Sequence, residues 1–210
     1  MVTMDMRNTV FPGITAAFLM VAAGAAQAAT IFADDFNRPA GNSVGNGWAE
    51  RESEADDVAI FADRLRLRDF VSDALPSASA LQTGLTGGGL VNISVSFDWR
   101  GINLESDDRF YFGWAAAGTD ALAVDLWTNT GFNSTDDQWR SATISLASVP
   151  NLFDVMFWSK VSQRSEGFAI DNFTVSGDVP APVPLPAAGW LMLAGIGGLA
   201  AAGRRRRRAG

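Results

Sequence analysis

VNISVSFDWR, residues 91–100, alternates apolar and polar side chains without interruption. The odd positions from Val91 to Trp99 are apolar, and the even positions from Asn92 to Arg100 are polar. Successive side chains of a β-strand point to opposite faces of the sheet, so a period of two predicts a strand with one face on a core and the other in solvent. This stretch therefore predicts a sheet with a buried side.

The same alternation continues on both sides of that stretch. Leu65 and Leu67 alternate with three arginines, and further apolar runs are separated by clusters of glycine, asparagine, aspartate and proline. This spacing is typical of an all-β sandwich, and no run has the period of a long helix. The further strands are predicted at residues 109–114, 121–127, 142–146, 153–161 and 168–175, with loops at residues 84–89 and 129–137.

The composition limits the chemistry available to the predicted body, residues 29–177, which suits one domain with one core. The chain has no cysteine and no histidine, which excludes disulfides, thiolate or imidazole metal ligands, and nucleophiles that depend on histidine. Without Arg7, Asp5 and the five terminal arginines, ten basic and twenty-two acidic residues leave a net charge of −12. Such a surface repels nucleic acid, which is not expected as a partner, and attracts divalent cations.

The C-terminus carries three features in a fixed order. A VPLPA pentapeptide is followed by an apolar run at residues 188–202 and by five consecutive arginines. Guanidinium groups cross a bilayer only at high cost, so the arginines are expected to stay on the cytoplasmic side. The residues concerned are Val183, Pro184, Leu185, Pro186 and Ala187, then Arg204, Arg205, Arg206, Arg207 and Arg208.

In this order the three features resemble the C-terminal sorting signal of the PEP-CTERM class, in its VPLPA variant. The resemblance implies an exosortase as partner, transient anchoring in the inner membrane by a transmembrane helix, cleavage near the pentapeptide, and delivery to the cell envelope, cell surface or extracellular matrix. The segment at residues 187–202 reaches only about 24 Å as a helix, short of a hydrocarbon core of about 30 Å. A marginal span suits a transient anchor, and a permanent membrane anchor is the alternative.

The N-terminus indicates export by the general route. Arg7 precedes an apolar stretch at residues 10–26, and Ala26-Gln27-Ala28 provides the small residues that a signal peptidase reads. Residues 1–28 are therefore predicted to be a signal peptide, with a retained N-terminal membrane helix as the alternative. Residues 178–210 hold a proline-bearing spacer and the C-terminal signal.

Three segments of the body carry a second resemblance. DDFNR at residues 34–38, GNGW at 45–48 and EGFAIDNFTV at 166–175 resemble the first and last strands of concanavalin-like jelly rolls, of the laminin G and MAM kind. The resemblance implies a two-sheet antiparallel jelly-roll sandwich in which the terminal strands lie close together. Members of these families bind sugars or proteins, and some are glycosidases.

Parity within the predicted strands separates the aromatic residues into two groups. Trp99 and Trp114 share a face with neighbouring apolar residues and are expected in the core. Tyr111, Trp127 and Trp158 are expected on the opposite face, where their rings could form a platform for sugars. The alternative is that this face is also covered and the rings are simply packed, since registers shift at bulges.

A structural calcium ion is the predicted cofactor. If the terminal strands are neighbours, Asp34, Asp35 and Asp171 converge, and Ca²⁺ prefers carboxylate and carbonyl oxygens. The alternative is that Asp171 and Asn172 belong to a turn or a bulge.

These observations predict an exported, non-enzymatic surface or matrix protein that binds or organises extracellular polysaccharide. Two alternatives remain open. One is a carbohydrate-active enzyme that uses aspartate and glutamate alone, which requires a suitable pair of carboxylates. The other is a purely structural surface protein, because a fold by itself does not define a function.

Overall fold

The structure, a computed structural model, describes residues 27–52, 54–68, 78–163, 165–181 and 194–197, together with Arg204 and Arg207. Ala26–Pro180 form one compact unit, and the two ends of the chain form another, which is described by itself. The first unit holds all the strands found among the described residues.

Strands dominate this unit. In chain order they are β1 (Ala28–Asp34), β2 (Trp48–Arg51), β3 (Val58–Ile60), β4 (Leu65–Leu67), β5 (Ala78–Thr86), β6 (Val91–Ile102), β7 (Arg109–Ala116), β8 (Thr128–Phe132), β9 (Arg140–Ser145), β10 (Leu152–Lys160) and β11 (Gly167–Asp178). A short 3-10 helix, η1 (Val124–Leu126), precedes β8.

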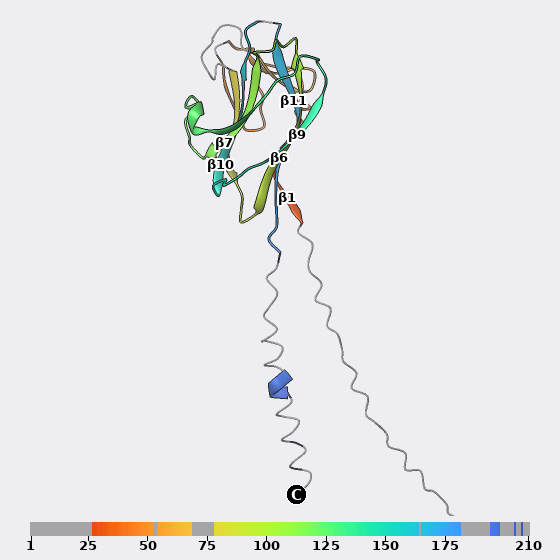
Figure 1. Cartoon of the computed structure of the whole chain (residues 1–210), viewed down its shortest axis with the longest axis vertical. Helices are drawn as coiled ribbons and strands as arrows, with labels where there is room; N and C mark the ends of the chain where they lie inside the picture. Colours follow the sequence, from red (N-terminus) through yellow and green to blue (C-terminus); the bar gives the residue numbers. More distant parts are fainter. Residues whose placement is uncertain are drawn as a thin grey trace, which may run out of the picture. The chain divides into compact units, whose positions relative to one another are not determined.

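The strands form two antiparallel sheets. The six-stranded sheet has the order β3-β4-β11-β6-β9, and β1 pairs with β11 beyond the end of β4. The five-stranded sheet has the order β2-β5-β10-β7-β8. In Figure 1, β7 and β10 lie on one side of the body and β9 and β11 on the other. The predicted all-β, two-sheet jelly-roll sandwich is confirmed.

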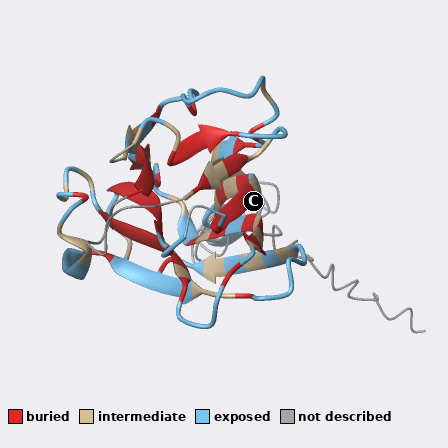
Figure 2. Ribbon diagram, turned by 90° about the horizontal axis from the view of Figure 1, so that it is seen from above, coloured by how far each residue is buried: buried red, intermediate tan, exposed pale blue. Residues whose placement is uncertain are grey.

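The core fills the space between the sheets. Ile93, Val95, Phe97 and Trp99 of β6 are buried, as their alternation predicts, whereas Val91, the first apolar residue of the strand, is exposed. Trp114 of β7 is buried in the same cluster, which confirms the core position predicted for Trp99 and Trp114. Figure 2 shows the buried residues mainly on the strands, and the exposed ones mainly on the connecting loops and on outer strands such as β8.

The prediction of a strand at residues 121–127 is wrong. The segment forms turns and η1 because local hydrogen bonds coil the backbone: the Leu122 N–H donates to the Asp120 carboxylate, and the Trp127 Nε1–H donates to the Asp120 carbonyl. Ala121 and Trp127 are nevertheless buried, which explains why the segment reads as apolar.

The two predicted loops at residues 84–89 and 129–137 are partly wrong, because each contains strand residues. Gly84 has a φ of +71° and lies at a register shift within β5, where its N–H donates to Asp154 of the neighbouring strand, so this glycine makes a bulge and does not end the strand. Gly131 of β8 lies opposite Tyr111, and a Cβ at this glycine would come within 3.0 Å of the Tyr111 ring. Gly84 thus supplies a left-handed backbone conformation, and Gly131 allows the close approach of the Tyr111 ring.

The predicted terminal signals lie almost entirely outside the described residues. Residues 1–26 and 182–193 are not described, and of the predicted sorting residues only Arg204 and Arg207 are. Residues 194–197 of the apolar run are helical. Among the described residues, no helix combines the length and the apolar character needed to cross a membrane.

Candidate functional site

The predicted aromatic platform is present as a cluster but is not open. Tyr111 and Trp158 lie opposite each other on β7 and β10, with ring centroids 5.2 Å apart and planes 14° apart. Trp127 joins the same cluster on the outer side of the five-stranded sheet. However, Trp127 is only 3% exposed and Trp158 only 2%, so neither presents a face to a ligand.

A second, small core explains this burial. Leu81, Ala115, Ala121 and Met156 surround the two tryptophans, and Val124 of η1 packs against them. The segment that contains η1 therefore covers this face of the sheet. We correct the platform prediction accordingly: parity placed the three rings together, but their role here is packing.

The predicted calcium ligands are not gathered into one group. The terminal strands are neighbours as expected, since Asp34 of β1 pairs with Phe173 of β11. Both oxygens of the Asp34 carboxylate, however, accept hydrogen bonds from the Arg38 guanidinium at 2.8 Å. Asp35 instead accepts a hydrogen bond from the N–H of Asn37. Among the described residues no group of three or more acidic side chains could hold a metal ion, so calcium stays a prediction without a coordinating group.

Asp34 is a structural carboxylate. It is 4% exposed and also accepts hydrogen bonds from the Phe36 N–H and from the Trp48 indole. Burial alone would raise its pKa, but the hydrogen bonds from Arg38 and from the Phe36 N–H outweigh burial and hold the pKa below its ordinary value.

Asp171 and Asn172 form a β-bulge, which was the alternative to a metal site. The register of β11 against β6 shifts between Asp171 and Thr174, and Asn172 has a φ of +52°. Asparagine tolerates this left-handed conformation better than most residues. As a result Asp171 and Asn172 are consecutive residues that both remain at the outer surface, while Phe173 returns to the core.

The outer face of the six-stranded sheet carries the most varied chemistry. One row of side chains crosses it from Arg66 on β4 through Ala169 on β11 to Arg100 on β6, all in register. Because Arg140 pairs with Trp99, the preceding residue Trp139 lies beside Arg100. The ring centroid of Trp139 is 5.5 Å from the guanidinium carbon of Arg100.

A second row, next to the first, is acidic. Asp171 of β11 lies directly opposite Asp98 of β6, which in turn lies opposite Ser141 of β9. Arg64, just before β4, extends this row and approaches Asp171 with an Nε to Oδ2 distance of 3.6 Å. The two rows together present an aromatic ring, two carboxylates and three guanidinium groups on one face.

Hydrogen bonds fix the two carboxylates. Asp98 accepts from the Ser141 hydroxyl at 2.5 Å and from the Asn172 amide at 2.9 Å, while Asp171 accepts from the Asn172 N–H at 2.8 Å. Burial raises the pKa of Asp171, and the negative charge of Asp98 raises it further. The hydrogen bond from the Asn172 N–H and the charge of Arg64 lower this pKa, but by less. Asn172, the bulge residue, thus donates hydrogen bonds to both carboxylates.

Trp139 is the exposed tryptophan of this face. It is 38% exposed, whereas the other five described tryptophans are at most 7% exposed. The guanidinium of Arg64 also lies 5.0 Å from its ring centroid, so two cations contact this ring. A hollow of about 340 Å³ lies next to the ring. Its lining residues are Arg64, Asp98, Trp139, Arg140, Ser141 and Asp171.

This arrangement has the elements needed to hold a sugar. An exposed indole offers a flat apolar surface to the C–H face of a pyranose, and fixed carboxylates and guanidiniums accept and donate hydrogen bonds to its hydroxyls. The hollow also lies on the surface of a sheet, where the middle of a polymer can lie across it.

The outward position of Trp139 could have been predicted from the sequence, but the predicted bounds of its strand were too narrow. The strand predicted at residues 142–146 begins two residues too late, because β9 starts at Arg140. Extending the alternation of Ala142 and Ile144 backwards puts Arg140 on the inner side and Trp139 on the outer side. That Trp139 lies near both Asp98 and Asp171 depends on the pairing of β6 with β11, and no local sequence pattern predicts that pairing.

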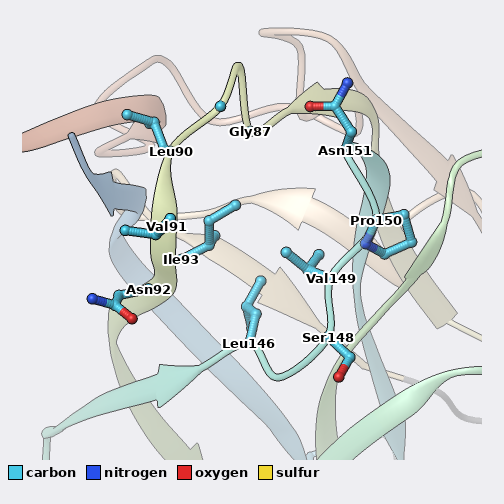
Figure 3. A pocket seen from close by; sticks show the side chains of 11 residues that line it. Gly87, Leu90, Val91, Asn92, Ile93, Leu146, Ser148, Val149, Pro150 and Asn151 are labelled. Atoms are coloured by element: carbon cyan, nitrogen blue, oxygen red, sulfur yellow. The ribbon is translucent and has the colours of Figure 1, made fainter. Parts of the chain in front are cut away.

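A second hollow, of about 400 Å³, lies at one end of the sandwich. Figure 3 shows Ile93 of β6 with Leu146 and Val149 of the following loop turned toward one another, while Asn92 and Asn151 lie at the margins. Among the described residues, no charged side chain and no aromatic ring lines this hollow. It therefore lacks the convergent polar groups that would orient a ligand.

Comparisons with known proteins place the fold in context. No family model and no curated protein matches the chain. Among solved structures, the cleaved K3 adhesin domain of Lys-gingipain from Porphyromonas gingivalis w83 is similar with a TM-score of 0.50 and 12% identity, over 71% of this chain and 99% of that one.

Carbohydrate-binding modules are similar at lower scores. The mannan-recognising module TmCBM27 has a TM-score of 0.45 and 11% identity, over 72% of this chain and 98% of that one. A family 29 carbohydrate-binding module has a TM-score of 0.44 and 10% identity, over 73% and 88%. At 12% identity the likeness to the adhesin domain concerns the sandwich fold alone, and the weaker likenesses add nothing to it.

Proposed function

We propose that the sandwich binds polysaccharide through the outer face of its six-stranded sheet, with Trp139 as the ring on which a sugar stacks. One observation carries this proposal: the exposed tryptophan of the described body lies at a hollow that also holds Asp98, Asp171 and Arg64. The predicted platform at Tyr111, Trp127 and Trp158 is replaced by this site.

The proposed role is binding without catalysis. Asp98 is held by donors from Ser141 and Asn172, and Asp171 lies beside the Arg64 guanidinium, so both acids are fixed as hydrogen-bond acceptors. Such groups select and orient hydroxyls, while the indole supplies apolar contact area.

A test of the binding site uses Trp139→Ala in the full chain, kept in a polyoxyethylene detergent that has no sugar headgroup. Affinity electrophoresis through gels that contain soluble polysaccharides should show a dissociation constant roughly thirtyfold larger for the variant. This corresponds to a loss of about 2 kcal/mol of binding free energy. Leu126→Ala is the matched control, because Leu126 is 65% exposed and far from this sheet face in the fold. Equal retardation of the Trp139 variant and the unaltered chain would refute the site.

A second candidate function, glycoside hydrolysis, is favoured by the cross-strand pair Asp98 and Asp171. The two acids are directly opposed on antiparallel strands, where Cβ atoms are about 4.5–5.5 Å apart, so their carboxyl groups lie near each other, as the two acids of a glycosidase must. The raised pKa of Asp171 suits a general acid. New reducing ends that appear with the unaltered chain and disappear with Asp171→Asn would favour the enzyme, and their absence would favour the binder.

We further infer that the protein is exported and processed at both ends. The proposal is supported by the signal peptide pattern at residues 1–28 and by the VPLPA motif, apolar run and arginine cluster at residues 183–208. Signal peptidase and an exosortase would be the processing partners. Cell fractionation should place the sandwich in the envelope, at the surface or in the matrix, and an intact chain in the cytosol with both ends uncut would contradict export.

A further inference from the structure

We infer that the polysaccharide is anionic and that its carboxylate or sulfate groups bind between Arg66 and Arg100. This inference rests on the proposed function and names the ligand class for the same sheet face. It follows from the arrangement of the first row of side chains, in a body that is acidic elsewhere.

The two arginines flank a small residue. Ala169 of β11 pairs with Arg66 of β4 on one side and with Arg100 of β6 on the other. All three side chains share one face, and two strand spacings separate the arginine backbones by roughly 9–10 Å. Ala169 is only 5% exposed, and its methyl group brings no polar atom that would compete for the two guanidiniums. An anion can therefore reach both guanidiniums.

Aromatic rings hold these guanidiniums in place. The guanidinium carbon of Arg66 lies 4.4 Å from the ring centroid of Phe61, and that of Arg100 lies 5.5 Å from the centroid of Trp139. Contact with a ring orients a guanidinium without neutralising its charge. The pair is thus arranged before any ligand arrives.

Among the residues that the structure describes, neither Arg66 nor Arg100 forms an ion pair. The neighbouring arginines differ, because Arg64 approaches Asp171 and Arg68 binds Asp56. Burial lowers the pKa of Arg66, and the positive charge of Arg68 acts in the same direction. A ligand anion would supply the partner that these groups lack.

Charge-assisted bonds to guanidinium are the strong class of hydrogen bonds, and a carboxylate or a sulfate can accept two of them. The net negative charge of the body opposes a dense polyanion such as nucleic acid. A glycan with widely spaced charges can instead meet the arginine pair while its rings contact Trp139.

The experiment compares polymers that differ only in charge, with the full chain in a polyoxyethylene detergent. Polygalacturonate with only a sparse set of free carboxylates is compared with its fully methyl-esterified form, and sparsely sulfated dextran with dextran. We expect at least one charged polymer to bind roughly tenfold or more tightly than its neutral counterpart, and the preferred pair distinguishes carboxylate from sulfate. Arg66→Gln and Arg100→Gln should each weaken binding of that polymer roughly tenfold, and should weaken binding of the neutral one by a clearly smaller factor.

Arg51→Gln is the matched control, because Arg51 is an exposed arginine on β2 of the other sheet. Unchanged melting temperatures would show that the variants fold. Equal binding of charged and neutral polymers, or of the arginine variants and the unaltered chain, would overturn this inference and leave the proposed function standing. Binding to DNA stronger than to any glycan would also overturn it. Failure to bind any polymer, charged or neutral, would instead overturn the proposed function.

Discussion

At the scale of single residues, Asp34 shows how a carboxylate can stabilise a core that has no disulfides. Its oxygens accept hydrogen bonds from Arg38, the Phe36 N–H and the Trp48 indole, so one acid connects the end of β1 to β2 and to the loop between them. An ion pair that is mostly buried and fully hydrogen-bonded is costly to break. Sequence spacing could not reveal this role, because it does not show that the Arg38 guanidinium binds both oxygens of Asp34.

Asp34→Asn should lower the free energy of unfolding by about 2 kcal/mol at pH 7, since hydrogen bonds to a charged group are lost. The pKa of Asp34 is lowered in the folded state, so its contribution is present above the unfolded pKa near 3.8 and is lost as the pH falls through the folded value. Urea unfolding at several pH values should therefore show the difference between variant and unaltered chain shrinking below about pH 4.

Asp125→Asn is the control for this prediction, because Asp125 is an exposed carboxylate on η1. A constant difference for the Asp34 variant from pH 7 to pH 2 would show that its effect comes from packing and not from charge.

At the scale of elements, local patterns predicted the central strands well and the covering segments poorly. The alternation at residues 91–100 predicted β6 because one side of that strand contacts the core and the other contacts solvent. Residues 121–127 are apolar for a different reason, since they pack on the outside of the five-stranded sheet as a coiled segment. Apolar runs of this length do not distinguish the two cases.

The same limit applies to the candidate site. Parity predicted that Tyr111 and Trp158 share a face, but whether another segment covers that face depends on tertiary structure. Trp139 could have been placed by parity, given the correct start of β9. The pairing of Asp98 with Asp171 depends on a bulge and on contact between β6 and β11, which lie far apart in sequence.

The packing of Trp158 on β7 gives a prediction at this scale. A Cβ on Gly113 would lie 2.8 Å from Trp158 Cζ3 and 3.0 Å from the Thr128 carbonyl oxygen, and both neighbours are rigid. Gly113→Ala should therefore destabilise the fold by about 1–3 kcal/mol in thermal or urea unfolding. Gly41→Ala, where a Cβ would meet nothing within 4 Å, is the control and should change stability little. Equal stability of the two variants would mean that the Trp158 ring is not held as described.

At the scale of the whole molecule, both sheets and the main core lie within Ala26–Pro180. A unit with its own core and complete strand pairing is expected to fold by itself. One outer side of the sandwich is covered by η1 and its flanking residues, while the other presents Trp139 with charged neighbours. This asymmetry supports the proposal that one sheet stabilises the sandwich and the other binds the ligand.

The most direct measurement is an NMR titration of the fragment Ala26–Pro180 with the polysaccharide that it binds, following the tryptophan indole N–H signals. The fragment contains six tryptophans, and the Trp139 signal is assigned by its absence in Trp139→Ala. The account predicts that this signal shifts on titration while those of Trp127 and Trp158 stay in place. Shifts at Trp127 and Trp158 with Trp139 unmoved would contradict it.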